Sequence, residues 1–248
     1  MLKTLAISCA LLLYSHTFGQ IVTLNGGLST SLIYASYNPS YGQNSDNWYK
    51  SEFSRYFNQG PLYFGWNISA GVQYLQRKRF FLSSDLGLNE IGGNGSQSNQ
   101  SGANPIGQSE LKTKLLFVSV NTLANVNFAE KGGSSLYVGL GPRVDFLVDQ
   151  KMPSTSFIDL YAIPDHLNKV VWGLYGKFGF HQVHKQFQFG TEIGFNYNIS
   201  QLLNYTTARY GNAPPDTKDD VNFKMNMNYV SVKISVGYVI KDRKSVGE

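Results

Sequence analysis

Strict alternation of apolar and polar residues dominates this chain and is clearest in residues 187–199. There one set of alternate positions is apolar except for Thr191, and the other set is polar or glycine. A period of two is typical of a β-strand. A tilted strand needs about 9–11 residues to cross a bilayer, and this segment exceeds that length. It therefore predicts a membrane-spanning strand.

The same alternation recurs along the chain and predicts eight strands in all. The other seven are residues 22–34, 62–74, 80–88, 116–128, 136–148, 170–180 and 230–238. After the N-terminal segment, no stretch offers ~18 consecutive apolar residues, so no transmembrane helix is expected.

The connections between these strands alternate between short and long. Short ones fall at residues 77–79, 129–134 and 181–184, and long ones at 37–60, 91–110, 150–167 and 201–222. Outer-membrane barrels have short periplasmic turns and long outer loops. We therefore expect an all-β fold, a closed antiparallel up-and-down transmembrane β-barrel of eight strands with both termini on the periplasmic side.

Aromatic residues on the apolar face gather near both ends of the strands, as in the interfacial girdles of membrane barrels. A soluble β-sandwich, the alternative fold, needs no such girdles. The short-turn girdle comprises Tyr74, Phe80, Phe128, Phe180, Phe187 and Tyr238, and the long-loop girdle comprises Tyr34, Phe64, Trp66, Phe146, Trp172 and Tyr197.

Two positions depart from the pattern. Met225, Met227 and Tyr229 alternate in one phase and Val230 onward in the other, which predicts a β-bulge near Tyr229 and Val230. Pro142 lies inside a strand and predicts a local break in the hydrogen-bonded ladder.

The N-terminal segment has the pattern of an export signal. Lys3 precedes an apolar run at residues 5–14, and small residues at 17 and 19 predict cleavage before Gln20. We expect a signal peptide over residues 1–19, an outer-membrane barrel domain over 20–248, and an outer-membrane location. The only cysteine, Cys9, lies in the signal, so neither a disulfide nor a thiol site is expected.

Charge excludes some partners and suggests an interior network. The formal charge is +5, with basic residues spread along the chain rather than in a stripe, so nucleic acid is not an expected partner. An eight-stranded barrel is filled by its own side chains, and buried charges need partners. These charges would form a salt-bridge network that seals the barrel or, alternatively, line a polar channel. The alternation of the strands places six charged residues inside: Asp85, Arg143, Asp145, Lys177, Glu192 and Lys233.

No catalytic, metal or cofactor site is expected. His181 and His184 fall in a short turn and are interpreted as solvated rather than metal-binding. His166 follows Asp165 in an outer loop that also holds Ser154 and Ser156, but no nucleophile and base stand at a defined spacing. Residues 92–95 resemble a phosphate-binding loop only superficially, because no helix is expected to follow, and are interpreted as a flexible loop.

The first long connection is crowded with aromatic residues that could form a recognition surface. They could equally pack on one another or on lipopolysaccharide, and the sequence leaves both interpretations open. The candidate residues are Tyr41, Trp48, Tyr49, Phe53, Tyr56 and Phe57.

A short turn with Lys131-Gly132-Gly133, followed by residues 136–142 with the step Gly139-Leu140-Gly141-Pro142, resembles the PorT-like outer-membrane β-barrel family. The final strand with Val236-Gly237-Tyr238 is similar to that family as well. The resemblance implies an outer-membrane barrel, and some members of the family are accessory parts of a secretion system.

The expected function is therefore that of a non-enzymatic outer-membrane barrel that presents loops for recognition or serves as an accessory subunit of a membrane assembly. Its expected partners are outer-membrane lipid, lipopolysaccharide and other envelope proteins. The alternatives are a narrow channel for small solutes and a lipid A-modifying enzyme that uses His and Ser at the outer rim.

Overall fold

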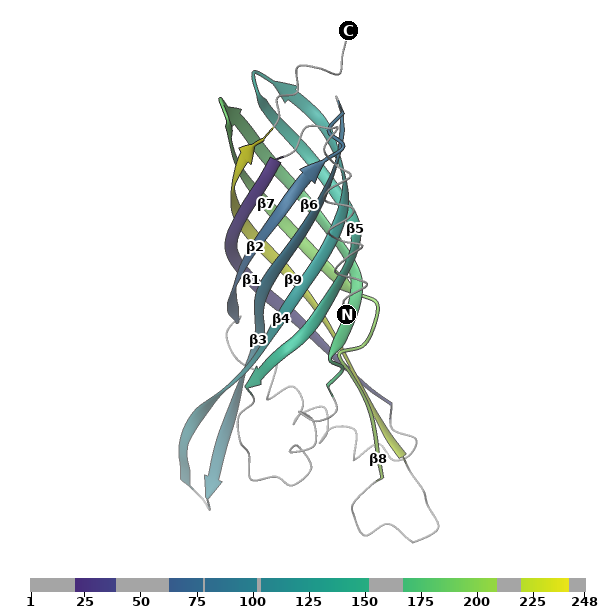
Figure 1. Ribbon diagram of the computed structural model, residues 1–248. Coiled ribbons are helices and arrows are strands. Elements are labelled where there is room, and N and C mark those ends of the chain that lie inside the picture. The colour runs from purple at the N-terminus through teal and green to yellow at the C-terminus, as the bar shows by residue number, and fades with distance from the viewer. Residues whose placement is uncertain are drawn as a thin grey trace.

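The computed structural model describes residues 21–38, 63–77, 79–101, 104–151, 167–208 and 220–240. Within these ranges the chain forms nine strands and no helix long and apolar enough to cross a membrane. Figure 1 shows them as one elongated barrel of tilted strands. The strands are β1 (Ile21–Asn38), β2 (Phe64–Tyr74), β3 (Phe80–Ser101), β4 (Asn104–Lys131), β5 (Ser134–Lys151), β6 (Val170–His184), β7 (Phe187–Asn198), β8 (Leu203–Ala208) and β9 (Asp220–Val239).

Eight of these strands close into the barrel, as the alternation predicts. Each strand from β1 to β7 pairs antiparallel with the next, β7 pairs with β9, and β9 pairs with β1. The β1–β9 ladder runs from Ile21↔Val239 to Asn38↔Asn222 and closes the ring. The short strand β8 lies outside the ring, and its ladder is with the outer part of β9. The predicted fold class is confirmed.

Two of the expected long loops are instead partly strand. The ladder between β3 and β4 continues to Ser101↔Asn104, whereas β2 leaves β3 at Asn67↔Asn89. The two strands therefore project beyond the barrel as a hairpin (Figure 1). The glycine-rich residues 92–95, interpreted as a flexible loop, lie in β3. Likewise β8 and the start of β9 occupy residues 203–208 and 220–222 of the expected loop 201–222.

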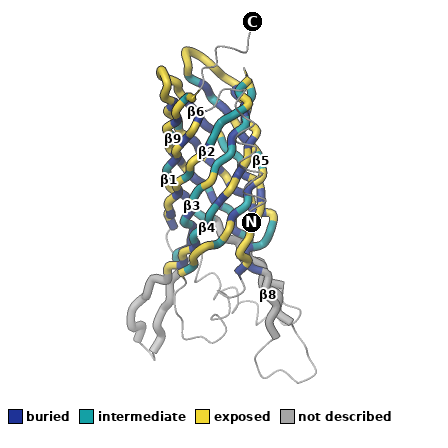
Figure 2. The backbone as a smooth tube through the Cα atoms, viewed as in Figure 1, coloured by how far each residue is buried: buried dark blue, intermediate teal, exposed yellow. Residues whose placement is uncertain are grey.

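The barrel wall has an apolar outside and a polar inside. Figure 2 shows buried and exposed positions alternating along the strands of the barrel wall. Ile234 is 68% exposed, Phe64 64% and Leu140 60%. This continuous apolar surface suits lipid rather than water. Nine of the predicted girdle aromatics are exposed on it: Phe64, Trp66, Phe128, Phe146, Trp172, Phe180, Phe187, Tyr197 and Tyr238.

The predicted bulge at Tyr229 and Val230 is wrong. The β1–β9 and β7–β9 ladders pass through both residues without a register shift. Met227 and Tyr229 break the pattern because their large side chains point into the barrel, where both are fully buried. Register shifts occur elsewhere, with Val148 as the extra residue on β5 and Phe128 as the extra residue on β4.

The predicted break at Pro142 is present. The β4–β5 pairing passes from Asn121↔Arg143 to Ala124↔Leu140 with no pair at Pro142, and the register does not change. On its other side Pro142 stays aligned with Leu174 of β6. Because proline has no backbone N–H, the ladder loses a bond there without displacing the strand.

Inward-facing glycines make room for large side chains from the neighbouring strand. The Tyr175 ring of β6 lies over Gly194 of β7, and the Tyr137 ring of β5 lies over Gly179 of β6. A Cβ atom at either glycine would overlap the tyrosine. The bare positions in the alternation are therefore filled by rings, which helps to pack the interior solid.

Gly194→Ala is expected to lower the free energy of unfolding by about 1–3 kcal/mol, because the methyl group must displace the buried Tyr175 ring. Urea-induced unfolding in lipid vesicles measures this change. Gly176→Ala is the matched control on β6, since its Cβ would meet Leu140 at an ordinary 3.7 Å. Equal stability of the two variants would contradict the packing of Tyr175 against Gly194.

Candidate functional site

The inner wall carries the six charged residues expected there. Arg143, Asp145, Glu192 and Lys233 are buried residues, and the Lys177 side chain is 7% exposed. Asp85 is intermediate in exposure. Three acids face three bases, so the set is electrically balanced, as charges enclosed in a narrow barrel require.

A lysine–glutamate–lysine triad links three adjacent strands. Glu192 of β7 accepts from Lys177 of β6 and pairs with Lys233 of β9, with both nitrogen–oxygen distances 3.2 Å. The Tyr137 hydroxyl donates to the same carboxylate at 3.4 Å. Each lysine also lies over a tyrosine ring, Lys177 at 5.5 Å from the Tyr137 centroid and Lys233 at 5.1 Å from that of Tyr175.

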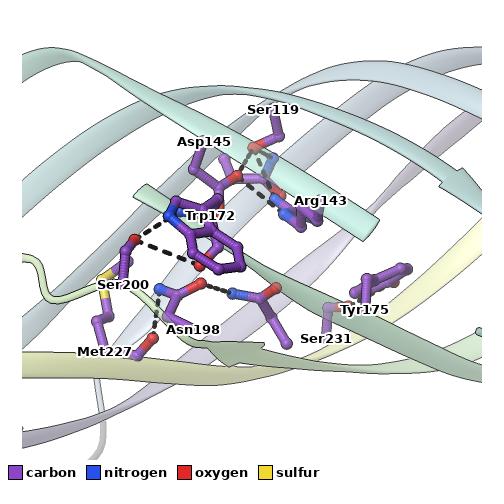
Figure 3. Close-up of polar contacts among 11 residues, drawn as sticks. Ser119, Arg143, Asp145, Trp172, Tyr175, Asn198, Ser200, Met227 and Ser231 are labelled. Carbon is purple, nitrogen blue, oxygen red and sulfur yellow. Dashed lines mark hydrogen bonds and ion pairs between the residues drawn. The ribbon is translucent and has the colours of Figure 1, made fainter. Parts of the chain in front are cut away.

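Arg143 is the centre of a second cluster (Figure 3). It lies nearer the long loops than the triad does, because Lys177 is paired with Gly139, four residues earlier on β5. Its Nε donates to Asp145 at 2.8 Å and an Nη donates to the Ser119 hydroxyl at 2.6 Å. Ser119 also donates to Asp145 and accepts from Asn89 at 2.8 Å. The cluster therefore joins β3, β4 and β5 through buried charge-assisted hydrogen bonds, which are the stronger kind.

The Arg143 guanidinium also spans the lumen. It lies 4.9 Å from the ring centroid of Tyr229 on β9 and 5.3 Å from that of Tyr175 on β6. In the closed ring β5 and β9 are separated by β6 and β7. One side chain thus bridges nearly opposite walls. Cation–π contacts in a desolvated site stabilise by about 2 kcal/mol each or more.

Asp85 of β3 completes the set of charges. Its carboxylate accepts from Asn25 at 3.4 Å and lies over Gly71 of β2. It also interacts electrostatically with Lys177 and Lys233. Asp85 is thereby tied to the triad, and Tyr175, which contacts both Arg143 and Lys233, joins the two clusters.

Above Arg143, toward the long loops, the barrel is closed by a mainly apolar layer. The segment after β7 folds inward, bridging Leu203 to Leu167, and the Asn168 N–H donates to the Leu202 carbonyl at 2.8 Å. Asn198 donates to the Met227 carbonyl at 2.6 Å (Figure 3). The fully or almost fully buried apolar residues here are Ile91, Leu115, Val171, Leu202, Leu203 and Met227.

The short-turn end is filled by rings, and the interpretation of His181 as a solvated turn residue is wrong. His181 belongs to β6, is 6% exposed, and lies 5.3 Å from the Tyr137 ring and 6.1 Å from that of Phe81. The turn begins only at Lys185, so residue 181 still belongs to the strand. Side chains alternate between the two faces of a strand, and His181 is on the inward face. His184 is exposed, as expected.

Several uncharged residues of the interior network were not predicted, because the prediction considered charged residues alone. Ser119 and the tyrosines Tyr137, Tyr175 and Tyr229 connect the charged groups, although none carries a charge. Their position in the sequence could have revealed three of them, because Ser119, Tyr137 and Tyr175 lie in the polar phase of their strands. Tyr137 and Tyr175 also lie beside a glycine of the next strand.

Other candidates lie outside the described residues or form no site. The loop aromatics Tyr41 to Phe57 and the group His166, Ser154 and Ser156 are outside the described residues. Among the residues that are described, no group of three His, Cys, Asp or Glu side chains could hold a metal ion.

Comparisons with known proteins agree with this architecture. A family model described as "Outer membrane protein beta-barrel domain" matches residues 64–204. The outer membrane protein OprG from Pseudomonas aeruginosa is 12% identical with a TM-score of 0.51, over 90% of this chain and 97% of that one. Neisserial surface protein A gives 11% identity and a TM-score of 0.42, over 88% and 96% of the two chains.

The Ail protein of Yersinia pestis gives 10% identity and a TM-score of 0.32, over 87% of this chain and 98% of that one. No curated protein matches the sequence. At 12% identity the likeness to OprG shows a shared fold alone. The family match spans more than half of the chain, which therefore belongs to the outer membrane protein beta-barrel domain family and is an outer-membrane protein in contact with outer-membrane lipid.

Proposed function

We propose that this protein is a non-enzymatic, non-conducting outer-membrane barrel that acts through its outer surface, either in recognition or as an accessory subunit of a membrane assembly. The observation that carries the proposal is the Arg143 side chain, which bridges nearly opposite walls of the lumen. In this proposal residues 1–19 are an export signal that is cleaved before Gln20.

The layered interior argues against the alternative of a narrow solute channel. From the long-loop side inward, a solute would meet the apolar layer, then Arg143, then the triad around Glu192, then the rings around His181. The Arg143 and Glu192 layers are tied to the wall by ion pairs and hydrogen bonds, and the apolar residues of the outer layer are buried. Opening a path would separate buried ion pairs, which costs several kcal/mol for each pair.

The outer side offers the surface that a binding function needs. The β3–β4 hairpin and the β8–β9 pair extend beyond the barrel on the long-loop side (Figure 1). The resemblance to PorT-like proteins supports the accessory-subunit form of the proposal. The loop aromatics Tyr41, Trp48, Tyr49, Phe53, Tyr56 and Phe57 remain proposed recognition residues.

A conductance measurement tests the closed lumen. Purified protein inserted into planar bilayers is expected to give no single-channel steps, because side chains fill each layer of the barrel. A large-pore porin inserted from the same detergent is the positive control. Reproducible steps from the wild-type protein would contradict the proposal and favour the channel.

A hairpin variant tests the outer surface. Residues 95–111 can be replaced by Asn-Gly, because Asn94 pairs with Lys112 and a two-residue turn can join them. In cross-linked outer membranes, wild-type protein is expected to carry a stoichiometric partner that the shortened variant lacks. The matched control replaces Gly132-Gly133 with Asn-Gly at the opposite end of the barrel. Loss of the partner in both variants, or in neither, would contradict a binding role for the hairpin.

A further inference from the structure

Exposed lysines gather on the outer rim of the barrel where β4, β5 and β6 lie side by side. Lys112 and Lys114 are on β4, Lys151 is on β5, and Lys169 immediately precedes β6. Lys114 and Lys151 are direct cross-strand partners. The Lys169 carbonyl accepts a hydrogen bond from the Leu147 N–H of β5 at 2.8 Å, so its backbone adjoins the same strand. We call these four residues the lysine patch.

The lysine patch begins where the apolar outer wall ends. On β4 the outward positions run through Val118 and Leu116 to Lys114. On β5 the lipid-facing residues Phe146 and Val148 precede Lys151 and are 41% and 55% exposed. The apolar band of such barrels is about 25 Å tall. The lysines therefore stand at the level of the lipid headgroups on the long-loop side.

Nearby acids only partly neutralise the lysine patch. Glu90 lies 4.0 Å from Lys114 and accepts from the Tyr63 hydroxyl at 2.5 Å. Burial, together with that hydrogen bond and the charge of Glu90, raises the pKa of Tyr63 well above its ordinary value, so the phenol remains a donor. Asp149 accepts from the Gln150 N–H at 2.9 Å.

Among the described residues, Lys151 and Lys169 form no ion pair, so positive charge remains at these two positions of the lysine patch. Like charges directly opposite one another destabilise a strand pair, yet Lys114 and Lys151 are opposed. Of the described acids on this face, Glu90 lies against Lys114 and Asp149 against the Gln150 backbone. An anion held between the two lysines would remove this repulsion.

We propose that the lysine patch binds the phosphate groups of lipid A, the anionic lipid of the outer leaflet. Ammonium groups and phosphate oxygens form charge-assisted hydrogen bonds. Basic residues at the headgroup level attract anionic lipids. Phe146 and Trp172, exposed just below on β5 and β6, provide the surface for the acyl chains of the same molecule.

Native mass spectrometry of the detergent-purified protein, titrated with bisphosphorylated lipid A, tests the proposal. The variant is Lys114→Gln with Lys151→Gln. Its affinity is expected to fall ~30-fold, since each basic residue near an anionic surface contributes about fivefold. The matched control is Arg79→Gln with Lys131→Gln, two exposed cations at the short-turn end, which should bind as the wild type does. Heat-dependent gel mobility checks that all variants are folded.

Two further ligands identify the chemistry. Wild-type protein should bind dephosphorylated lipid A weakly, with an affinity like that of the double variant for bisphosphorylated lipid A. Inorganic phosphate at millimolar concentration should not displace bound lipid A from the wild-type protein. Undiminished binding by the folded double variant would overturn the proposal. So would equal affinity for the dephosphorylated lipid, or complete displacement by inorganic phosphate, which would indicate a site for the free ion.

Discussion

Glu192→Gln is expected to lower the free energy of unfolding by about 3–5 kcal/mol, because Lys177 and Lys233 would lose the carboxylate that contacts both of them. Two ammonium groups would then share one narrow lumen with Asp85 as the remaining nearby acid. Urea titration of the protein refolded in lipid vesicles, followed by tryptophan fluorescence, measures the change.

Restoring the charge balance should recover part of that loss. In Glu192→Gln combined with Lys233→Met, Lys177 and Asp85 remain as one base and one acid. The double variant should therefore be more stable than Glu192→Gln alone. Glu130→Gln, an exposed carboxylate at the end of β4, should change stability by no more than ~0.5 kcal/mol. A double variant less stable than Glu192→Gln would show that the shape of the side chains, and not their charge balance, holds this layer together.

Arg143→Met should also lower the free energy of unfolding by about 3–5 kcal/mol, because a different buried ion pair is broken. Asp145 would keep its negative charge while losing its 2.8 Å ion pair, and Ser119 would lose a donor. The rings of Tyr175 and Tyr229 would also lose the cation that contacts them. The same vesicle titration measures the effect.

Removing both charges of this pair provides the control. Arg143→Met with Asp145→Asn leaves no uncompensated ion and should be more stable than Arg143→Met alone. Arg79→Met, at an exposed position near the short β2–β3 turn, should leave stability unchanged. If Arg143→Met unfolds at the same urea concentration as wild type, the arginine does not brace the lumen.

The barrel was predictable because its walls face two different environments. A strand with lipid on one side and a polar interior on the other must alternate, so residues 187–199 and their seven counterparts reveal both the strands and the inward phase. That phase placed Arg143, Lys177 and Glu192 inside. Proline behaved as its missing N–H requires, with a local gap at Pro142.

The same reasoning fails where one of the two environments is missing. The β3–β4 hairpin projects beyond the apolar wall, so it has no apolar face and its glycines at 92–95 resemble a loop. At Tyr229 the opposite happens: the large side chains of Met227 and Tyr229 occupy the interior phase, and the resulting change of pattern resembles a bulge that is not there. His181 was misplaced because β6 continues to His184, closer to the turn than the alternation indicates.

Contacts across the lumen could not be predicted from strand parity at all. Whether Arg143 meets Tyr229 depends on the stagger of strands that are not neighbours, and on which glycines leave room for rings. Stagger and tilt belong to the closed barrel as a whole. The stagger and the tilt cannot be predicted from the sequence of a single strand.

The ladder that joins β1 to β9 also constrains how the protein reaches its native state. Its partners, beginning with Ile21 and Val239, lie almost the whole chain length apart. Contacts of such high sequence separation form late and slowly, because the entropy of closing a very long loop must be overcome first. Until β9 arrives, β1 and β7 are open edges whose N–H and C=O groups have no partner in hydrocarbon. Folding and insertion must therefore be completed together, and loss of β9 alone should leave an assembly intermediate rather than a smaller barrel.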